Sequence, residues 1–178
     1  MTTLTTHRLE GDLAVFLIGA RVLKPWRPDA WFPAFAAMAP MLAELARDPE
    51  AGLLHARTTI DADLRGVTVV QYWRSIEDIY RYANDRERKH RPAWLAFYRR
   101  ARRVPGAVQV WHESYAIPAG GHESLYSDAP RPFGLARATG SIAAARRGRT
   151  ARERLRSPVA PTPAPAEVDP SPAERATG

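Results

Sequence analysis

The stretch that decides the fold is LAVFLIGARV, residues 13–22. It is too short for a long helix and is rich in β-branched and aromatic residues, which predicts a buried strand. Successive side chains of a strand point to opposite faces of the sheet. The two alternating sets are Val15, Leu17 and Gly19, and Phe16, Ile18 and Ala20. Because both sets are apolar, the sheet needs a cover on each face.

Helical and strand patterns alternate after this strand. Apolar residues at steps of three and four predict a helix over about 30–47. Leu53–Asp61 and Gly66–Trp73 predict a β-hairpin. Helices are expected after Ser75 and over about 92–103, and a last strand over Ala107–Ile117. The helix after Ser75 is expected to present one apolar face, made of Ile76, Ile79, Tyr80 and Ala83. The order predicts an α+β, ferredoxin-like βαββαβ fold with a four-stranded antiparallel sheet.

One chain has enough helix to cover only one face of this sheet. The other face needs a second copy packed sheet to sheet, or a ligand cavity between the sheet and its cover. We therefore predict a homodimer, with a small-molecule substrate as the other partner.

The chain has 178 residues, which indicates a single domain, and we place it at residues 8–136. Residues 137–178 are rich in Ala, Arg and Gly and then in Pro, with six prolines over 157–172, which predicts a disordered tail. The formal charge of +7 is concentrated there: eight arginines and four acids give that segment a net +4. The domain is therefore nearly balanced in charge, which argues against a nucleic-acid partner.

Several classes of function have no support in the sequence. There is no cysteine, which excludes disulfides and thiolate metal sites. The strongest apolar run, Leu13–Ala20, is shorter than the roughly 20 residues of a membrane span, and residues 1–12 have no apolar stretch of signal-peptide type, so we expect neither a span nor a signal peptide. We expect a soluble, cytoplasmic protein. Phosphate-binding glycine loops, a nucleophile elbow, and flavin or nicotinamide motifs are all absent.

Five runs of residues carry a family resemblance: 16–21 (FLIGAR), 26–31 (WRPDAW), 70–74 (VQYWR), 90–94 (HRPAW) and 111–115 (WHESY). Together they resemble the family typified by the fumagillin-pathway polyketide monooxygenase, which belongs with the antibiotic-biosynthesis monooxygenases of the dimeric α+β barrel superfamily. The resemblance covers about residues 8–135. A later family segment has an Asn-Met pair where this chain has Asp128 and Ala129.

Two neighbouring residues of the last strand are candidate catalytic groups. His112 shares a face with Val108 and Val110, and an imidazole in an apolar pocket can act as a general base near neutral pH. The alternative is a hydrogen-bonded core histidine. Glu113 lies on the opposite face, with Trp111 and Tyr115, and it could instead form an ion pair with Arg21 or Arg74.

Further residues are candidates for holding a substrate. The aromatic walls of a pocket for a flat molecule, or otherwise core residues, are Trp73, Trp94 and Trp111. Donors that could stabilise developing charge are Arg21, Tyr72 and Tyr115. His90 joins this set because it lies in the family pattern, although it could also be a solvated loop residue.

The resemblance implies a cofactor-independent monooxygenase that acts on a polyketide-like or other electron-rich molecule, with no metal. Relatives in the wider superfamily bind haem through one axial histidine and act as peroxidases, haem-degrading enzymes or aldoxime dehydratases, so haem is the alternative cofactor. A third alternative is a non-catalytic barrel that binds a small molecule.

Overall fold

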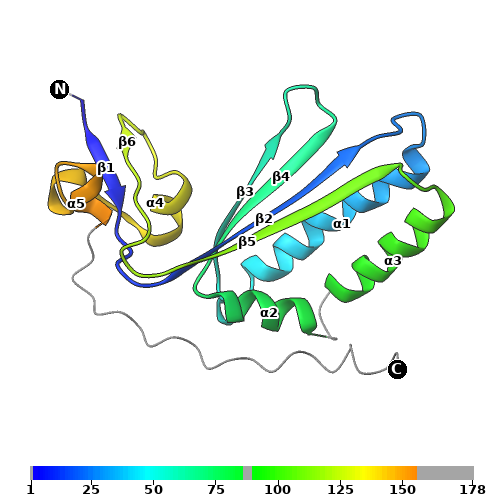
Figure 1. The fold of residues 1–178 in the computed structure, drawn as a ribbon, viewed down its shortest axis with the longest axis horizontal. Helices are drawn as coiled ribbons and strands as arrows, with labels where there is room; N and C mark the ends of the chain where they lie inside the picture. Colours follow the sequence, from blue (N-terminus) through cyan, green and yellow to red (C-terminus); the bar gives the residue numbers. More distant parts are fainter. Residues whose placement is uncertain (1, 86–89, 156–178) are drawn as a thin grey trace.

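The computed structural model describes residues 2–85 and 90–155, without the side chains of residues 90–94, 100 and 101. It shows an α+β protein with two antiparallel sheets (Figure 1). The larger sheet has the strand order β3-β4-β2-β5. Its strands are β2 (Leu13–Val22), β3 (Leu53–Ile60), β4 (Gly66–Trp73) and β5 (Val108–Ile117). The predicted α+β class and antiparallel pairing are therefore confirmed.

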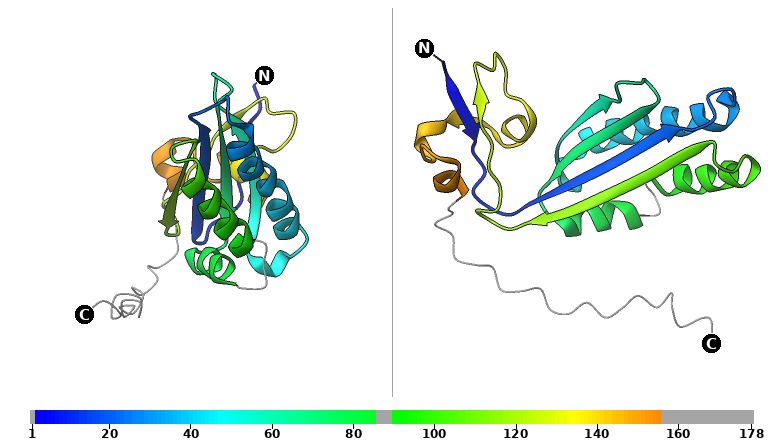
Figure 2. Two further views of the ribbon diagram at one scale, coloured as in Figure 1. Left: turned by 90° about the vertical axis from the view of Figure 1, so that its right-hand side faces the viewer. Right: turned by 45° about the horizontal axis from the view of Figure 1, so that its top comes forward.

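Helices cover one face of the larger sheet (Figure 2). They are α1 (Pro28–Ala46), α2 (Ile76–Asn84) and α3 (His90–Arg103), and a short 3-10 turn, η1 (Pro49–Ala51), follows α1. Pro28 occupies the first turn of α1, where its missing N–H costs nothing. The Ser75 hydroxyl accepts the N–H of Asp78 at 3.1 Å and caps α2, as the sequence predicts.

The core lies between the helices and the sheet. It is made of Ala14, Leu45, Ala51, Trp73, Ile79 and Tyr82, with Phe16, Leu53 and Ile76 packed against it. The predicted apolar face of α2 is wrong at one position, because Tyr80 is 57% exposed and Tyr82 is buried. Tyr80 lies four residues after Ile76 and Tyr82 lies three after Ile79, so either tyrosine could belong to an apolar helix face.

A second folded part, the terminal unit, is formed by residues 2–12 and 118–155. Its three-stranded sheet has the order β6-β1-β7. The strands are β1 (Leu4–His7), β6 (Tyr126–Ser127) and β7 (Ser141–Ala143), and the helical turns are α4 (Gly134–Thr139), η2 (Ala144–Arg146) and α5 (Ala151–Leu155). Figure 1 shows it at the end of the larger sheet where β2 begins and β5 ends.

The terminal unit corrects part of the predicted tail. Residues 137–155 are folded, and the boundary at residue 136 falls inside α4. Arg154 is only 5% exposed, because its guanidinium pairs with Glu123 at 2.6 Å. A basic composition therefore did not mean a solvated chain here. Residues 156–178 lie outside the described part of the chain.

Asp128, one of the two residues that depart from the resembled family's segment, has a special backbone conformation. Its φ of 47° lies in the left-handed region, which Asn and Asp tolerate better than most residues. Its carboxylate accepts the N–H of Thr3 at 2.7 Å, and its own N–H donates to the Thr3 carbonyl at 2.9 Å. An aspartate thus supplies the oxygen acceptor that an asparagine could also supply.

The face of the larger sheet away from the helices is called the open face. The terminal unit covers one end of it: α4 packs against β3, and the Arg57 guanidinium lies 5.1 Å above the centre of the Phe133 ring. Among the helices of the described residues, none has the length and apolar character needed to cross a membrane.

Candidate functional site

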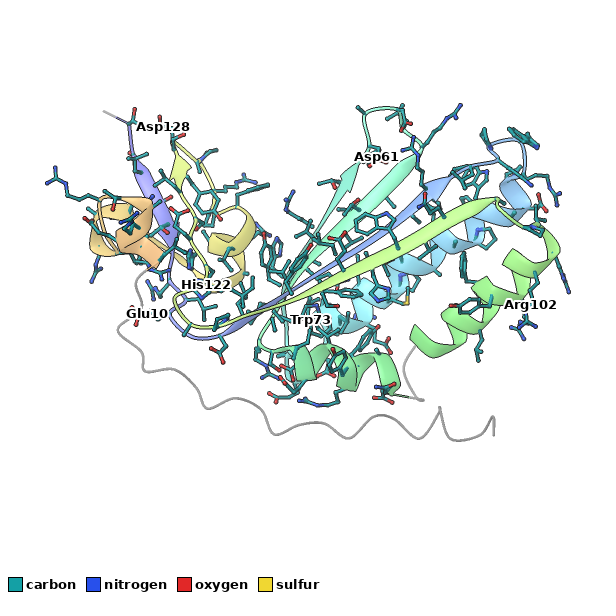
Figure 3. The ribbon with its side chains drawn as sticks, viewed as in Figure 1. Glu10, Asp61, Trp73, Arg102, His122 and Asp128 are labelled. Atoms are coloured by element: carbon teal, nitrogen blue, oxygen red, sulfur yellow. The ribbon has the colours of Figure 1, made fainter. Side chains whose placement is uncertain are left out.

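An apolar cavity of about 60 Å³ lies between the sheet and helices α1 and α2 and is called the inner cavity. The sheet supplies Phe16, Ile18, Gln71 and Trp73, and the helices supply Met38, Met41, Leu42, Leu45, Ile79, Tyr82 and Ala83. Figure 3 shows Trp73 where the sheet meets α2. Because its lining is almost wholly apolar, this cavity suits a hydrophobic molecule.

Besides Trp73, the side chains with polar groups that line the inner cavity are those of Gln71 and Tyr82. The Trp73 indole N–H donates to the Gln71 side-chain oxygen at 2.9 Å, and both residues are buried. This contact leaves the amide nitrogen of Gln71 as the end that can donate to a ligand. The ring centre of Tyr82 lies 6.0 Å from that of Trp73.

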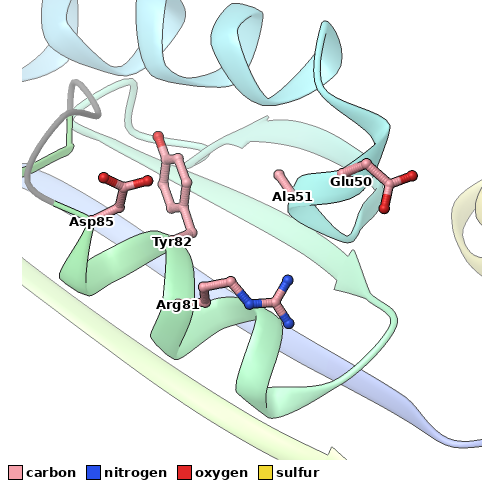
Figure 4. A pocket seen from close by; sticks show the side chains of 5 residues that line it. All are labelled: Glu50, Ala51, Arg81, Tyr82 and Asp85. Atoms are coloured by element: carbon pink, nitrogen blue, oxygen red, sulfur yellow. The ribbon is translucent and has the colours of Figure 1, made fainter.

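A second pocket of about 210 Å³ opens beside η1 and α2 and is called the outer pocket. It is lined by Glu50, Ala51, Arg81, Tyr82 and Asp85 (Figure 4). The Arg81 guanidinium pairs with the buried carboxylate of Asp78 at 2.7 Å.

His112 lies on the helix side of the sheet, the same face as Phe16, as the strand alternation predicts. The two ring centres are 5.6 Å apart. The prediction that His112 is enclosed in an apolar pocket is wrong, because β5 is an edge strand and the side chain is exposed. His112 therefore lies at the rim of the inner cavity, next to a residue that lines it, and not among the lining residues.

Glu113 and Tyr115 lie on the open face. The Tyr115 hydroxyl donates to the Glu113 carboxylate at 2.6 Å, and both side chains are exposed. This hydrogen bond, together with the negative charge of Glu113, raises the pKa of Tyr115. The two predicted catalytic residues, His112 and Glu113, are thus on opposite sides of the sheet and cannot share one site within a single chain.

Trp111 also lies on the open face, across from Gly19 in the register of β2 and β5. A Cβ on Gly19 would lie 2.3 Å from the Trp111 ring, so the indole packs directly on the glycine. Trp111 therefore walls the open face, whereas Trp73 is 1% exposed on the helix side.

Arg21 and Tyr72 occupy opposite ends of the open face. Arg21 pairs with Asp61, at 2.9 Å, and with Asp63 in the β3–β4 turn. Arg74 pairs with Asp78, as described below. The alternative that Arg21 or Arg74 pairs with Glu113 is therefore wrong.

Tyr72 lies near the terminal unit. A Cβ on Gly134 would be 3.4 Å from the Tyr72 hydroxyl, which places that hydroxyl beside the start of α4. Arg74, at the end of the same strand, pairs instead with Asp78 at 3.1 Å.

Two predicted residues cannot be placed in a site. His90 and Trp94 belong to α3, but their side chains lie outside the described part of the structure.

The family follows from a match over most of the chain. The model of the family described as "Monooxygenase af470-like" matches residues 13–135. The chain belongs to the monooxygenase af470-like family. Every residue that lines the inner cavity lies within the matched range, whereas β1 and α5 lie outside it. None of the curated proteins matches the chain.

Solved structures share the fold of this family member at low identity. An aldoxime dehydratase, OxdRE, in complex with butyraldoxime has a TM-score of 0.58 and 17% identity, over 71% of this chain and 37% of its own. A further aldoxime dehydratase has a TM-score of 0.56 and 16% identity, over 74% of this chain and 38% of its own. The chain thus spans little more than a third of these enzymes, and the likeness shows the fold alone.

A cofactor-independent oxygenase also aligns with the chain. SnoaB from Streptomyces nogalater has a TM-score of 0.43 and 15% identity, over 58% of this chain and 91% of its own.

A buried histidine pair, His7 before the family match and His122 inside it, was not assigned a role from the sequence. His7 Nε2 lies 2.7 Å from His122 Nδ1, and His7 Nδ1 lies 2.7 Å from the Ser124 hydroxyl. The Arg147 guanidinium also donates to His7 Nε2. Burial, together with the nearby Arg147 and His122, lowers the pKa of His7 to about 3. His122 lies at the base of the terminal unit (Figure 3).

The arginine fixes the hydrogen positions on His7. Because a guanidinium can only donate, Nε2 of His7 accepts and Nδ1 carries the proton toward Ser124. His122 Nε2 lies 2.8 Å from the Gly11 carbonyl, so a neutral His122 can donate either to that carbonyl or from Nδ1 to His7 Nε2, and not to both. The cluster, which we call the histidine clasp, ties β1 to the segments that follow β5.

The residues that line the inner cavity were partly visible in the sequence. Met38, Leu42 and Leu45 belong to the apolar stripe that predicts α1. Gln71 and Tyr82 were missed. Gln71 is a polar residue at a position of β4 that faces the helices, beside Trp73 and Val69. This pattern could identify Gln71 only after it was known which face of the sheet the helices cover.

Proposed function

We propose that this family member is a small-molecule oxygenase that needs no cofactor and oxidises a polyketide-like or other electron-rich substrate in the inner cavity. The observation that carries the proposal is the inner cavity itself, with its apolar lining and the Gln71 amide. A water-poor chamber with few polar groups favours reactions in which charge develops on the substrate and water would quench the intermediate.

The reaction begins with loss of a proton. A base removes an acidic C–H or O–H proton from the substrate, and the carbanion or phenolate that remains gives one electron to dioxygen. The two radicals combine into a peroxide anion, which takes up one proton, in place of the proton lost in the first step, and the resulting hydroperoxide loses water. For an anthrone-type CH₂ group, the substrate gains one oxygen atom as a carbonyl, and the second oxygen atom and the two hydrogens leave as water.

Two side chains of this chain supply the catalytic groups. His112, at the rim beside Phe16, is the proposed base, and its exposure lets it pass the proton to solvent. The Gln71 amide nitrogen donates to the developing oxyanion, since its oxygen is held by the Trp73 indole. Met38 and Met41 allow the lining to change shape around a ligand, because methionine is unbranched and adaptable.

Oxygen uptake by the purified, metal-free protein tests this function with a panel of anthrones and polyphenols. We expect His112→Ala and Gln71→Leu to lower kcat, the latter by about 100-fold if the amide binds the oxyanion. Gln109→Leu, at an exposed position of β5, is the matched control and should keep wild-type turnover. Retained turnover in His112→Ala would remove that residue as the base. Ligand binding without oxygen uptake would show the non-catalytic barrel instead.

We also propose that two copies pack by their open faces. Val15, Leu17 and Val70 are only half-buried there in a single chain, and an uncovered apolar strand surface is unfavourable in water. Sedimentation over a concentration series should show a dimer. Leu17→Glu, in the middle of β2, should shift it to the monomer, whereas Leu64→Glu, in the exposed β3–β4 turn, should not. Single subunits at high wild-type concentration would contradict the proposal.

The described residues do not form a cavity for haem, the alternative cofactor. His112, the candidate axial ligand, is exposed on an edge strand and is not among the residues that line the inner cavity. The proposed reaction therefore uses no haem. A visible spectrum after haem addition checks this, because a Soret shift that is lost in His112→Ala would favour the haem enzyme.

A further inference from the structure

The four most exposed large hydrophobic side chains of the described residues lie at one end of the molecule. They are Leu64, Trp26, Ile60 and Phe32, which are 82%, 71%, 65% and 60% exposed. Trp26 precedes α1 and Phe32 lies near its start, while Ile60 ends β3 and Leu64 lies in the turn between β3 and β4. Hydrophobic residues scattered singly over a surface are ordinary, whereas a group of them at one end marks a contact surface.

The topology of the larger sheet brings these segments together. Because its neighbouring strands are antiparallel, β2 and β3 end where β4 and β5 begin. The Val22 N–H donates to the Arg65 carbonyl at 2.7 Å, and the Leu23 N–H donates to the Ala107 carbonyl at 2.9 Å. Figure 1 shows this region at the end of the sheet away from the terminal unit. We call residues 21–32, 60–66 and 102–108 the loop end.

Leu64 has a backbone conformation that does not favour leucine. Its φ of 58° lies in the left-handed region, where a side chain is strained. The turn is closed by hydrogen bonds from the Leu64 N–H to the Asp61 carbonyl and from the Asp61 N–H to the Gly66 carbonyl, each 2.9 Å long. Glycine or asparagine would fit this turn with less strain. Because the Leu64 side chain is exposed, burial within the chain does not offset the strain, which points to burial against a partner.

The loop end is basic. It holds six basic residues and three acids, a net +3. All three acids are already paired within the loop end, Asp61 and Asp63 with Arg21, and Asp29 with Arg27. Among the described residues, no carboxylate pairs with the other four cations, which are Lys24, Arg65, Arg102 and Arg103. The complement of this surface is therefore anionic as well as apolar.

Exposed aromatic side chains next to unpaired cations match a lipid surface. Trp and Phe suit the boundary between lipid headgroups and acyl chains, and Lys and Arg are attracted to anionic headgroups. Figure 3 shows Arg102 on α3, at the same end of the molecule as the β3–β4 turn that carries Asp61. An acidic polypeptide would match the charge, but an extended acidic chain offers little apolar surface to Trp26 and Leu64.

We infer that the loop end docks the protein on an anionic lipid surface, with Trp26, Phe32 and Leu64 entering the headgroup region. Such a contact is peripheral and requires no membrane span, because side chains on loops reach only the boundary of the acyl chains. The inference goes beyond the proposed oxygenase and does not depend on it.

Co-sedimentation of the full-length protein with lipid vesicles tests the docking. The vesicles are made of phosphatidylcholine alone or of phosphatidylcholine with phosphatidylglycerol. We expect binding to the anionic vesicles, weaker at high salt, and little binding to phosphatidylcholine alone. Trp26→Ser and Leu64→Asn should each weaken binding by about tenfold, because each removes a large apolar side chain from the contact. Leu125→Asn, at an exposed leucine of the terminal unit, is the matched control and should bind as wild type.

Two further comparisons separate docking from folding and from general attraction of a basic chain. Asparagine tolerates the left-handed region, so Leu64→Asn should keep or raise the Tm while its vesicle binding falls. Arg102→Gln combined with Arg103→Gln should weaken binding and reduce its salt dependence. Arg149→Gln combined with Arg152→Gln, which removes two exposed arginines of the terminal unit, should leave binding unchanged.

Three results would overturn the docking: no binding to anionic vesicles, equal loss in Leu64→Asn and Leu125→Asn, or a loss confined to the terminal-unit arginine pair. Binding of polyglutamate that is lost in Trp26→Ser, without vesicle binding, would also overturn it and would assign the loop end to an acidic protein. Absence of oxygen uptake would count against the proposed oxygenase and would leave vesicle binding unaffected, so the two failures are distinguishable.

Discussion

Acid should loosen the terminal unit through His7. In the native chain, burial together with Arg147 and His122 lowers the pKa of His7 from 6.5 to about 3. An unfolded chain binds this proton near pH 6.5, so between pH 6.5 and 3 the unfolded state holds more protons than the native state. The stability that neutral His7 contributes is therefore complete above pH 6.5 and is lost as the pH falls toward 3.

The size of the effect follows from the shift. One pKa unit corresponds to about 1.4 kcal/mol, so the stability should fall by up to about 1.4 kcal/mol per pH unit in this window. At pH 5 the loss from His7 alone is about 2 kcal/mol relative to pH 8. The structural reason is that a proton on Nε2 would point at the Arg147 guanidinium, which can only donate.

Amide hydrogen exchange is the appropriate assay, because the terminal unit could open without global unfolding. The opening free energy of the β1 amides, Thr6 and His7, is measured from pH 5 to 8 in wild type and in His7→Gln, which cannot titrate. The wild type should lose about 2 kcal/mol toward pH 5 relative to this variant. His112→Gln, an exposed histidine, is the control and should follow wild type. Parallel pH profiles for wild type and His7→Gln would refute the reasoning.

Three further substitutions test individual contacts. Gly19→Ala should cost about 1–3 kcal/mol in urea unfolding, because the new Cβ would lie 2.3 Å from Trp111; Gly11→Ala, with nothing within 4 Å, should be neutral by the same assay. Ser75→Ala removes the cap of α2 and should cost about 1 kcal/mol, measured as a lower Tm. Asp78→Asn should cost about 1–2 kcal/mol in low salt and less in high salt, since both arginines it binds are substantially exposed. An unchanged unfolding midpoint would contradict the contact concerned.

The larger sheet was predictable because its strands carry strong local signals. Leu13–Val22 is apolar at every position except Arg21, and Ser75 is a side-chain cap whose partner is three residues away. The order of strands and helices then restricts the topology. The irregular register between Leu53 and His55 could not be predicted, because a bulge moves side chains from one face to the other without changing the composition of the strand.

The terminal unit was not predictable in the same way. Strands β6 and β7 have two and three residues, too few to show an alternation. Their order depends on contacts across long separations, such as the 2.7 Å contact of His7 with His122, which lies 115 residues later. Arg154 is buried only because Glu123 is there to pair with it. From its composition alone, such a segment is predicted to be solvated.

The sequence predicted a single set of candidate site residues. The structure places them on two opposite faces of the larger sheet. Alternation places Trp73 and His112 on one face and Trp111, Glu113 and Tyr115 on the other. The sequence does not say which of these faces the helices cover, because both are apolar. The buried face could be identified only from the packing of α1 and α2 on Phe16 and Trp73.

The two faces of the sheet differ in how well they exclude water, and this difference decides which face suits the proposed oxidation. Helices of the same chain cover the helix side, so Gln71 and Trp73 are buried in a single copy. The open face becomes dry only if a second copy covers it, and the carboxylate of Glu113 would then be desolvated with one hydrogen bond from Tyr115 to offset the cost. An oxidation that needs a dry chamber in every assembly state must therefore use the helix side. Loss of turnover on dilution to a folded monomer would move the reaction to the open face.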